Sequence, residues 1–320
     1  MSLSGRRLFD YAELLAAMVL WGSLYPISKL VLVQLSPYQL ALARASIAFL
    51  ALLMLTLIQG KGSQALSELR DHPWPSASLG LLSFLLSSIL ALLAVHFLPA
   101  SVVGMVTATS PLWLALAAII AYRPADFGKT LLGAAIALAG VGLVLFQDGV
   151  TAVLTGDGLD PRGIAIALLL AVVIAMQAAW GRRVMTGRDP VVVTCVGCGW
   201  SIPPLLALAA AEGGVGSLLV LSGPTLAIVL YLGVGCTALN FTLFNDALKR
   251  VPADQAAAFQ YLIPFISALL AHIFLGEIIT WSLMAGGVAI ILGLVLTQER
   301  RKPSDVRGRV KETAGERYCP

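Results

Sequence analysis

Long apolar runs, separated by short polar or Pro/Gly-containing breaks, dominate the chain. A membrane-spanning helix needs about 20 mainly apolar residues. Ten runs meet this requirement, at approximately residues 11–33, 38–58, 75–95, 101–121, 128–146, 163–181, 190–211, 225–245, 253–275 and 280–297. The pattern therefore predicts an all-α polytopic membrane protein with ten transmembrane helices.

The composition supports this prediction. Only 12% of the 320 residues are charged, 58% are hydrophobic, and the mean hydropathy is +0.90. A soluble domain carries about a quarter of its residues as charge. Water cannot solvate the surface that such a chain would present, which excludes a soluble globular protein, a disordered chain and a nucleic-acid binder.

The few charges are distributed unevenly between the breaks. If the N-terminus is cytoplasmic, the inner segments hold 18 of the 21 Lys and Arg residues, and the outer connection 147–162 is acidic. Cytoplasmic loops carry the excess of positive charge. Both termini are therefore expected in the cytoplasm, in the inner (cytoplasmic) membrane of a cell, with a short N-terminal segment 1–10 and a basic tail 299–320 that contacts anionic lipid.

The chain also repeats itself at an offset of 153 residues. Matching Pro and Gly are informative because each reports a backbone requirement. The matched pairs include Pro37/Pro190, Gly80/Gly233, Pro111/Pro264, Gly133/Gly286 and Gly140/Gly293. The repeats occupy 11–146 and 163–298, joined by an extracytoplasmic linker 147–162. Because each contains an odd number of spans, the second is inverted, as in transporters that rock between two related conformations.

Two stretches of this sequence resemble a known family. Trp21-Gly22-Ser23, Lys29, Leu35-Ser36-Pro37 and Arg44 are similar to the opening of EamA-type members of the drug/metabolite transporter superfamily. The run from Pro252-Ala253 through Tyr261-Leu262-Ile263-Pro264 and Leu275-Gly276-Glu277 to Gly286 and Gly293 resembles the repeat signature of that family. The resemblance implies two inverted EamA repeats and export of small metabolites, often amino acids. The chain departs from it at Arg123-Pro124, where the second copy has Gly276-Glu277.

Polar residues near the middle of the spans are candidate substrate ligands, because burying them without a partner costs a few kcal/mol. Spans one, three, four, six, eight and nine enclose the cavity if the resemblance holds. The candidates are Trp21, Tyr25, Ser87, Thr107, Trp113, Gln177, Asn240, Gln260 and Tyr261. The alternatives are hydroxyls that bond their own helix backbone, aromatic side chains that only pack between helices, and Trp at the membrane interface.

Two prolines and three charged residues complete the candidate site. Pro111 and Pro264 each remove a backbone donor at mid-span, and so either loosen a gating helix or only shape the bundle. Lys29 and Arg44 lie in the outer thirds of their spans and either form a cationic vestibule for a carboxylate substrate or extend to the interface. Glu277, at the outer end of span nine, is able to pair with either of them.

Other chemistry has little support. Cys195 and Cys198 form a C-x-x-C without a second ligand pair, so we expect helix packing rather than a metal. No H-E-x-x-H motif, paired intramembrane aspartates or Ser/His pair favours an enzyme. No Asp or Glu lies at the middle of a span, which favours facilitated transport, exchange or coupling through a peripheral group over a midplane proton carrier.

The sequence therefore predicts a secondary transporter that exports or exchanges a small organic metabolite, an amino acid or related solute, by alternating access. We expect a small-molecule substrate, contact with membrane lipid, no cofactor, and a monomer or homodimer. The alternatives are a multidrug or cation carrier, a nucleotide-sugar-type carrier, a channel, and a membrane-embedded enzyme. A nucleotide sugar requires more basic residues in the cavity than Lys29 and Arg44 supply.

Overall fold

The computed structural model describes residues 3–114, 116, 127–146, 158–248, 250–251 and 259–297. These ranges are helical, and no strand occurs in them. Six helices within them are long and apolar enough to cross a membrane, by length and composition, and four further apolar helices have 10–17 residues. The all-helical, multi-span prediction is confirmed, while the number of ten spans and the orientation of the termini stay predictions. Most of the predicted linker, residues 147–157, and the basic tail 299–320 lie outside the described residues.

The first repeat starts with two long helices and a third span assembled from three consecutive segments. In chain order the elements are α1 (Leu3–Val31), α2 (Pro37–Ile58), α3 (Gly62–Asp71), α4 (Pro73–Gly80), the π-helix η1 (Leu81–Leu86), α5 (Ser87–Phe97), α6 (Ala100–Thr107) and α8 (Phe127–Leu145). Helix α3 is a short connection that the hydropathy pattern did not predict, because its composition is polar.

The second repeat follows the same plan. Its elements are α10 (Pro161–Met185), α11 (Pro190–Glu212), the 3₁₀ turn η2 (Gly216–Leu219), α12 (Gly223–Leu230), the π-helix η3 (Tyr231–Leu239), α13 (Asn240–Leu248), α15 (Ile263–Leu275) and α16 (Trp281–Thr297). The two π-helices end at Leu86 and Leu239, which the 153-residue offset relates to each other.

A common N-terminal signal sets the start of several long helices. Ser36 caps α2 in a capping box with Gln39, and Asp160 and Asp189 cap α10 and α11 through their carboxylates. In all three helices a proline follows the cap residue. The cap side chain satisfies backbone N–H groups that the helix leaves free, and proline at the first helical position has no N–H to satisfy. These signals explain why the expected starts at 38, 163 and 190 agree with the structure within about two residues.

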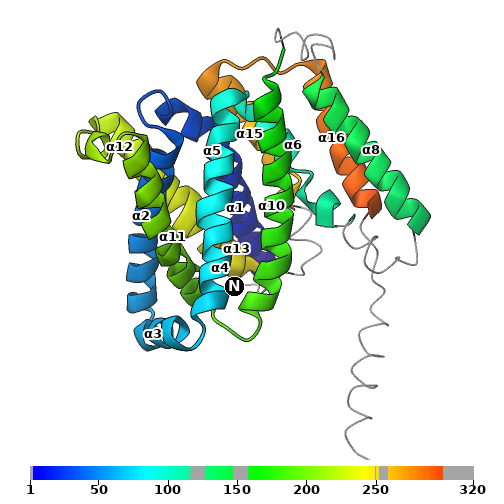
Figure 1. The fold of residues 1–320 in the computed structure, drawn as a ribbon. Coiled ribbons are helices and arrows are strands. Elements are labelled where there is room, and N and C mark those ends of the chain that lie inside the picture. Colours follow the sequence, from blue (N-terminus) through cyan, green and yellow to red (C-terminus); the bar gives the residue numbers. More distant parts are fainter. Residues whose placement is uncertain are drawn as a thin grey trace, which may run out of the picture.

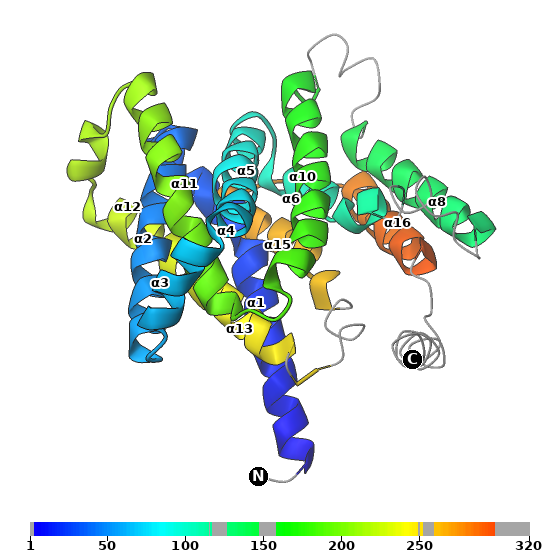
Figure 2. The ribbon, with the colours of Figure 1, turned by 60° about the horizontal axis from the view of Figure 1, so that its bottom comes forward.

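Helix α1 lies in the middle of the bundle, where it contacts α5, α6, α12, η3, α13 and α15 (Figure 1). Helices α8 and α16 pack against each other at one edge of the molecule (Figures 1 and 2). The start of α1 and helix α3 mark one end of the bundle, the α3 end, and α12 lies toward the opposite end, the α12 end. Helix α1 begins about two turns earlier than its apolar run, so it extends beyond the bundle at the α3 end (Figure 2).

The repeat is visible in the closest contacts between helices. A Cβ added to Gly140 would lie 2.7 Å from the carbonyl oxygen of Gly286, and a Cβ added to Gly293 would lie 2.4 Å from that of Gly133. The 153-residue offset exchanges these two contacts. Gly80 likewise approaches Gly197, as Gly233 approaches the carbonyl oxygen of Arg44, and the same offset relates these contacts. The repeated glycines therefore serve close helix packing, and the structure supports the duplication.

Candidate substrate-binding site

The π-helices deliver the polar residues Ser87 and Asn240 to equivalent places in the two repeats. A π-helix widens the turn and is frequent at functional sites. The hydroxyl of Ser87 donates to the carbonyl of Leu82, five residues earlier (2.9 Å), and that of Thr237 donates to Leu232 in the same way (3.0 Å). The hydroxyls therefore satisfy carbonyls of the widened turns. The chain continues as α5 and α13, which start with Ser87 and Asn240.

Each of these two residues contacts a predicted ligand on the first helix of a repeat. Ser87 donates a hydrogen bond to Oε1 of Gln177 on α10 (3.1 Å). In the orientation that satisfies both ends of its amide, Asn240 donates to the carbonyl of Ala17 (3.2 Å) and accepts from Nε1 of Trp21 on α1 (2.9 Å). Asn240 is fully buried. The structure thus joins four of the predicted residues in two pairs, and each pair connects the first repeat with the second.

Aromatic rings surround the indole of Trp21. Phe244 lies with its ring centroid 5.0 Å away, and Phe241 meets the indole edge-on at 5.9 Å. Both phenylalanines belong to α13. Trp21 therefore packs between α1 and α13, and its N–H has a buried acceptor, as an indole inside a bundle requires.

Two spans are interrupted by a turn next to the predicted gating prolines. The helix of span four stops at Thr107, turns at Ala108–Thr109 and resumes at Ser110. Residues 259–260 are helical, a turn follows at 261–262, and α15 begins at Ile263. The 153-residue offset relates the two turns. Broken helices of this kind surround the midplane sites of many transporters.

The position of the prolines changes their expected effect. Pro264 lies in the first turn of α15, where a missing N–H costs nothing and no kink results. Pro111 follows directly on the residue at which the span-four helix resumes. We therefore assign the interruption to the turns, and the prolines to the start of the helical segments after them. Gating by these segments stays a prediction.

We refer to the helix interruption at 108–109 as the first break and to that at 261–262 as the second break. Tyr25 connects the first break to Arg44. Its side chain is 8% exposed, its hydroxyl interacts with Thr107, and it lies within electrostatic reach of Arg44. Thr107 donates to the carbonyls of Val103 (2.9 Å) and Gly104 (3.1 Å). Arg44 donates from Nη2 to the hydroxyl of Ser88 on α5. We refer to Tyr25, Arg44, Ser88 and Thr107 as the Arg44 cluster; it joins α1, α2, α5 and α6 inside the bundle.

The three residues of the predicted vestibule do not form one site. Glu277 accepts hydrogen bonds from the backbone N–H groups of Ala100 (2.7 Å) and Ser101 (3.0 Å) and from the Ser101 hydroxyl (2.6 Å). Lys29 lies 3.3 Å from the Glu277 carboxylate and donates to the carbonyl of Leu98 (2.9 Å). Glu277 therefore caps the N-terminus of α6 and binds Lys29, and it has no such contact with Arg44.

Arg44 is buried, with 7% of its surface exposed. Among the described residues, no carboxylate lies within ion-pair distance of it, and its Nη1 atom has no hydrogen-bond partner. The snorkelling interpretation of Arg44 does not fit this position, because the guanidinium points into the bundle toward Ser88.

The remaining predicted ligands, Trp113, Gln260 and Tyr261, lie at or beside the helix interruptions at 108–109 and 261–262. Trp113 donates from Nε1 to the hydroxyl of Thr109 in the first break (3.3 Å). Gln260 is partly buried beside the second break, and Tyr261 packs against the buried cluster that includes Tyr25. Their roles as ligands stay predictions.

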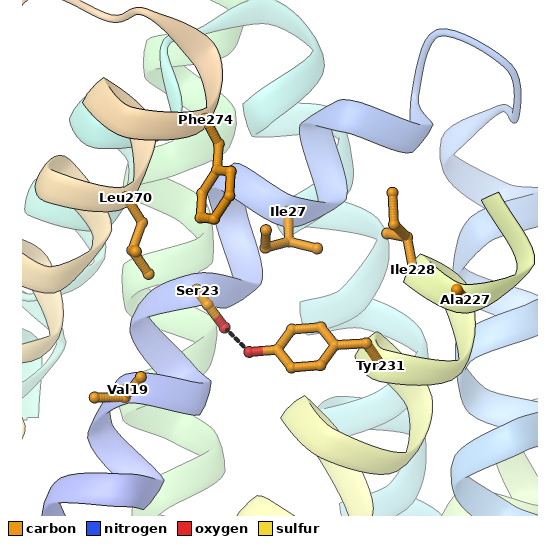
Figure 3. A pocket seen from close by; sticks show the side chains of 8 residues that line it. All are labelled: Val19, Ser23, Ile27, Ala227, Ile228, Tyr231, Leu270 and Phe274. Atoms are coloured by element: carbon orange, nitrogen blue, oxygen red, sulfur yellow. Dashed lines mark hydrogen bonds between the residues drawn. The ribbon is translucent and has the colours of Figure 1, made fainter. Parts of the chain in front are cut away.

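A cavity of about 490 Å³ opens between α1, α12, η3 and α15. Its lining is mainly apolar: Val19, Ser23, Ile27, Ala227, Ile228, Tyr231, Leu270 and Phe274. The hydroxyls of Ser23 and Tyr231 point toward each other across it and are 2.7 Å apart (Figure 3). Ser23 also lies 3.5 Å from the thiol of Cys236, which is within electrostatic reach of Arg44. The polar wall of the cavity is therefore next to the Arg44 cluster.

Sequence reasoning did not select Ser88 and Tyr231 as site residues. Their importance depends on contacts between distant segments, and a single serine or tyrosine in an apolar run carries no signal of its own. The cysteines behave as expected of packing residues. Cys198 donates to the carbonyl of Ala45 across the α2–α11 interface (3.3 Å), and Cys195 is a buried free thiol.

Comparison with known proteins identifies the family. The model of the EamA-like transporter family matches residues 11–146 and 161–298. The chain belongs to the EamA-like transporter family. This EamA-like transporter is 28% identical over 285 residues to "Uncharacterized transporter YdfC" of Bacillus subtilis (strain 168), with 87% of each chain covered.

Two further comparisons bear on this EamA-like transporter. It is 29% identical over 175 residues to a protein of Salmonella typhimurium named "Probable amino-acid metabolite efflux pump", covering 52% of this chain and 57% of the other. A crystal structure of another protein shares the fold with a TM-score of 0.63 at 20% identity, over 90% of this chain and 97% of that chain. The family and its apolar helices make this chain a multi-pass membrane transporter, and the observed polar pairs and broken helices lie within its two repeats.

Proposed function

We propose that this EamA-like transporter exports or exchanges a small organic metabolite, an amino acid or related solute, across the inner (cytoplasmic) membrane by alternating access. The observation that carries the proposal is the pair of interrupted helices at 108–109 and 261–262, related by the repeat offset. Together with the two π-helices, they give each half of the molecule the same set of bends. Two symmetric arrangements of one set of bends are what alternating access requires.

The substrate class is supported by the protein of Salmonella typhimurium and a similarly named protein of Escherichia coli, which is 25% identical over 213 residues. The site residues agree with a small polar solute. The predicted ligands offer ring faces, amides and hydroxyls, from Trp21, Tyr25, Gln177 and Asn240. A nucleotide sugar would require a dense set of positive charges instead. No acidic residue accompanies them among the described contacts, which does not favour a cation carrier.

The test is transport by the purified full chain in proteoliposomes, with radiolabelled amino acids outside and unlabelled ones inside. A carrier gives saturable uptake that internal substrate accelerates; a conductance that rises linearly with concentration indicates a channel and contradicts the proposal. The same assay with and without a pH gradient separates exchange or facilitated transport from proton coupling. Gln177→Ala and Gln260→Ala should reduce flux at least about tenfold without lowering the amount of protein in the membrane, and Gln59→Ala, at the α3 end of α2, is the matched control.

A further inference from the structure

Among the residues that the structure describes, the buried charge of Arg44 has no counterion. A buried ionised group without a partner is strongly unfavourable, and such groups within membrane spans mark substrate or ion pathways. The other buried charged side chain in the described part of the chain has a partner: Glu68, at the α3 end, lies 3.1 Å from Arg188. Lys29, which is only partly buried, binds Glu277. With the described residues, Arg44 forms one hydrogen bond, to Ser88, and its Nη1 atom remains unsatisfied.

A second unsatisfied polar atom lies on the helix next to this charge. Ser28 is 1% exposed, and its hydroxyl has no partner. Among the described residues, Ser28 Oγ and Arg44 Nη1 are the two buried side-chain polar atoms in this condition. Ser28 follows Tyr25 by one turn of α1, and Tyr25 lies within electrostatic reach of Arg44. Ser28 therefore lies one turn along α1 from a residue that interacts with Arg44.

The face of α1 on which Ser28 lies follows from the packing of its neighbours along the helix. Leu24 and Ile27 pack against the cluster built on α2, whereas Tyr25 belongs to the cluster built on α6. On a helical wheel, Ser28 lies between these two faces. It thus faces the region between these two clusters, and Arg44 reaches from α2 to Ser88 on α5.

The chemistry of these groups fits one carboxylate. A guanidinium presents a planar set of donors that matches the two oxygens of a carboxylate. The neighbours of Arg44 are neutral: the hydroxyls of Tyr25 and Ser88 and the thiols of Cys198 and Cys236. One cation surrounded by neutral donors balances one negative charge and not the several of a nucleotide.

The repeat makes this group unique. The 153-residue offset takes Arg44 to Gly197, which packs directly against Gly80 and leaves no room for a side chain there. In an otherwise duplicated molecule, the positive group is present in one copy. A single charge gives an asymmetric solute one defined orientation in the site.

We propose that Arg44, assisted by the Ser28 hydroxyl, binds the carboxylate of the transported solute and selects carboxylic acids over their amides and amines. The proposal rests on the proposed function, because it assigns the charged part of the same substrate. It also places that carboxylate beside Tyr25 and Thr107, at the end of the first broken helix. Movement at the break would then change the access of the bound anion to either side.

The test compares matched ligands on the purified full chain in detergent. Thermal unfolding is recorded with the twenty amino acids, propionate and pyruvate, and with the amide and the decarboxylated amine of every acid that stabilises. The wild type should bind the acid at least tenfold more tightly than either analogue. Arg44→Gln should remove this preference, Arg44→Lys should retain part of it, and Ser28→Ala should weaken acid binding about threefold. Arg162→Gln, which changes an arginine exposed at the α12 end, is the control and should behave as the wild type.

The outcomes separate this proposal from the proposed function. Stabilisation by no carboxylate, equal affinity for acid and amide in the wild type, or an unchanged preference in Arg44→Gln each overturns the Arg44 site. Since the wild-type comparison needs no variant, it can overturn the proposal even if Arg44→Gln does not fold, and Arg44→Lys, which keeps the positive charge, then tests the assignment to Arg44. Acid-selective binding without flux in proteoliposomes keeps the Arg44 site and overturns transport of these solutes. Saturable flux without acid selectivity keeps the proposed transport and overturns the Arg44 site.

Discussion

At the residue scale, Glu277 shows how one carboxylate holds several segments together. It accepts three hydrogen bonds at the N-terminus of α6 and an ion pair from Lys29 on α1, and it is itself anchored just after α15. The positive end of the helix dipole favours a carboxylate there. Gly276, with φ of +68°, ends α15 in the left-handed conformation and turns the chain back toward α6. The Leu-Gly-Glu motif therefore has a structural explanation in this chain.

Glu277→Gln should lower the free energy of unfolding by about 2 kcal/mol, because charged hydrogen bonds are replaced by weaker neutral ones and Lys29 loses its counterion. Thermal unfolding in detergent measures the change. Glu212→Gln, at the exposed end of α11, removes the same charge and should be neutral. An equal effect of both variants would contradict the role assigned to Glu277.

The sequence indicated that Glu277 was significant but not what it binds. Its position in a motif and the scarcity of carboxylates in the spans selected it. Its partners Ala100 and Ser101 lie 177 and 176 residues away, and nothing in a local pattern relates such segments. Lys29 and Arg44 looked equivalent for the same reason. Only packing shows that Lys29 has a carboxylate partner and that Arg44 has none among the described residues.

At the scale of elements, the α8–α16 pair depends on glycines that the sequence did identify. Gly140 and Gly142 lie two residues apart on α8 and differ in surroundings. A Cβ on Gly140 would meet the backbone of α16 at 2.7–2.8 Å, whereas nothing lies within 4 Å of a Cβ on Gly142. The first position requires the absence of a side chain, and the second does not.

Gly140→Ala should therefore destabilise the protein by about 1–3 kcal/mol, the usual cost of overpacking a close contact. Gly142→Ala should be neutral or stabilise by up to about 1 kcal/mol, because alanine restricts the unfolded chain and favours a helix. Thermal unfolding of the two variants side by side decides the matter. Comparable stability of both would show that α8 and α16 are not in this close contact.

The loops at the α3 end are joined by an ion pair between the repeats. Lys61 lies 2.6 Å from Asp189, whose carboxylate also accepts from the N–H groups of Val191 and Val192 at the start of α11. Partial burial acts to raise the pKa of Asp189, but the hydrogen bonds from Lys61 and these amides outweigh it, and the net pKa is lowered.

A lowered pKa stabilises the folded state above the pKa of the unfolded carboxyl, roughly 3.9, and this contribution is lost as the pH falls through the folded value. Asp189→Asn retains an N-cap side chain and removes the charge. It should cost up to about 1 kcal/mol at pH 7, because the pair is partly exposed, and the difference from the wild type should shrink as the pH falls below about 3.9 and through the lowered folded pKa. Unfolding curves at several pH values measure it; a difference that persists unchanged at pH 3 would exclude this origin.

Element positions were largely predictable, and their interruptions were not. Apolar runs bounded by Ser-Pro or Asp-Pro gave the helix starts because the cap and the proline act locally. The π-helices η1 and η3 have the same hydropathy as ordinary helix, since widening a turn changes hydrogen bonding and not composition. The breaks at 108–109 and 261–262 lie just before Pro111 and Pro264, so the prolines signalled them without showing on which side the helix stops.

At the scale of the whole molecule, the duplication was the most reliable sequence inference, because aligned Pro and Gly report backbone requirements that recur in space. The contacts of Gly140 with Gly286 and of Gly293 with Gly133 show this directly. What the duplication does not determine is the departure from symmetry. The 153-residue offset aligns Arg44 with Gly197, and under the proposed carboxylate site this difference between the copies would orient the substrate.

The orientation of the whole molecule in the membrane follows from its charges. Helix α3 and the start of α1 lie at the same end, and α16 also ends toward it (Figure 1). Arg188 and Lys61 lie at this α3 end in ion pairs with Glu68 and Asp189. The positive-inside rule therefore predicts that the α3 end faces the cytoplasm.

Cysteine labelling tests this orientation in cells. Cys195, Cys198 and Cys236 are buried and should give little background. In a Cys319→Ser chain, Ser217→Cys, exposed between α11 and α12, should react with a membrane-impermeant maleimide on intact cells. Ser67→Cys, exposed on α3, should react only after permeabilisation, as should the natural Cys319. Labelling of Ser67→Cys in intact cells with protection of Ser217→Cys would reverse the orientation, and would place the Lys29–Glu277 pair on the cytoplasmic side.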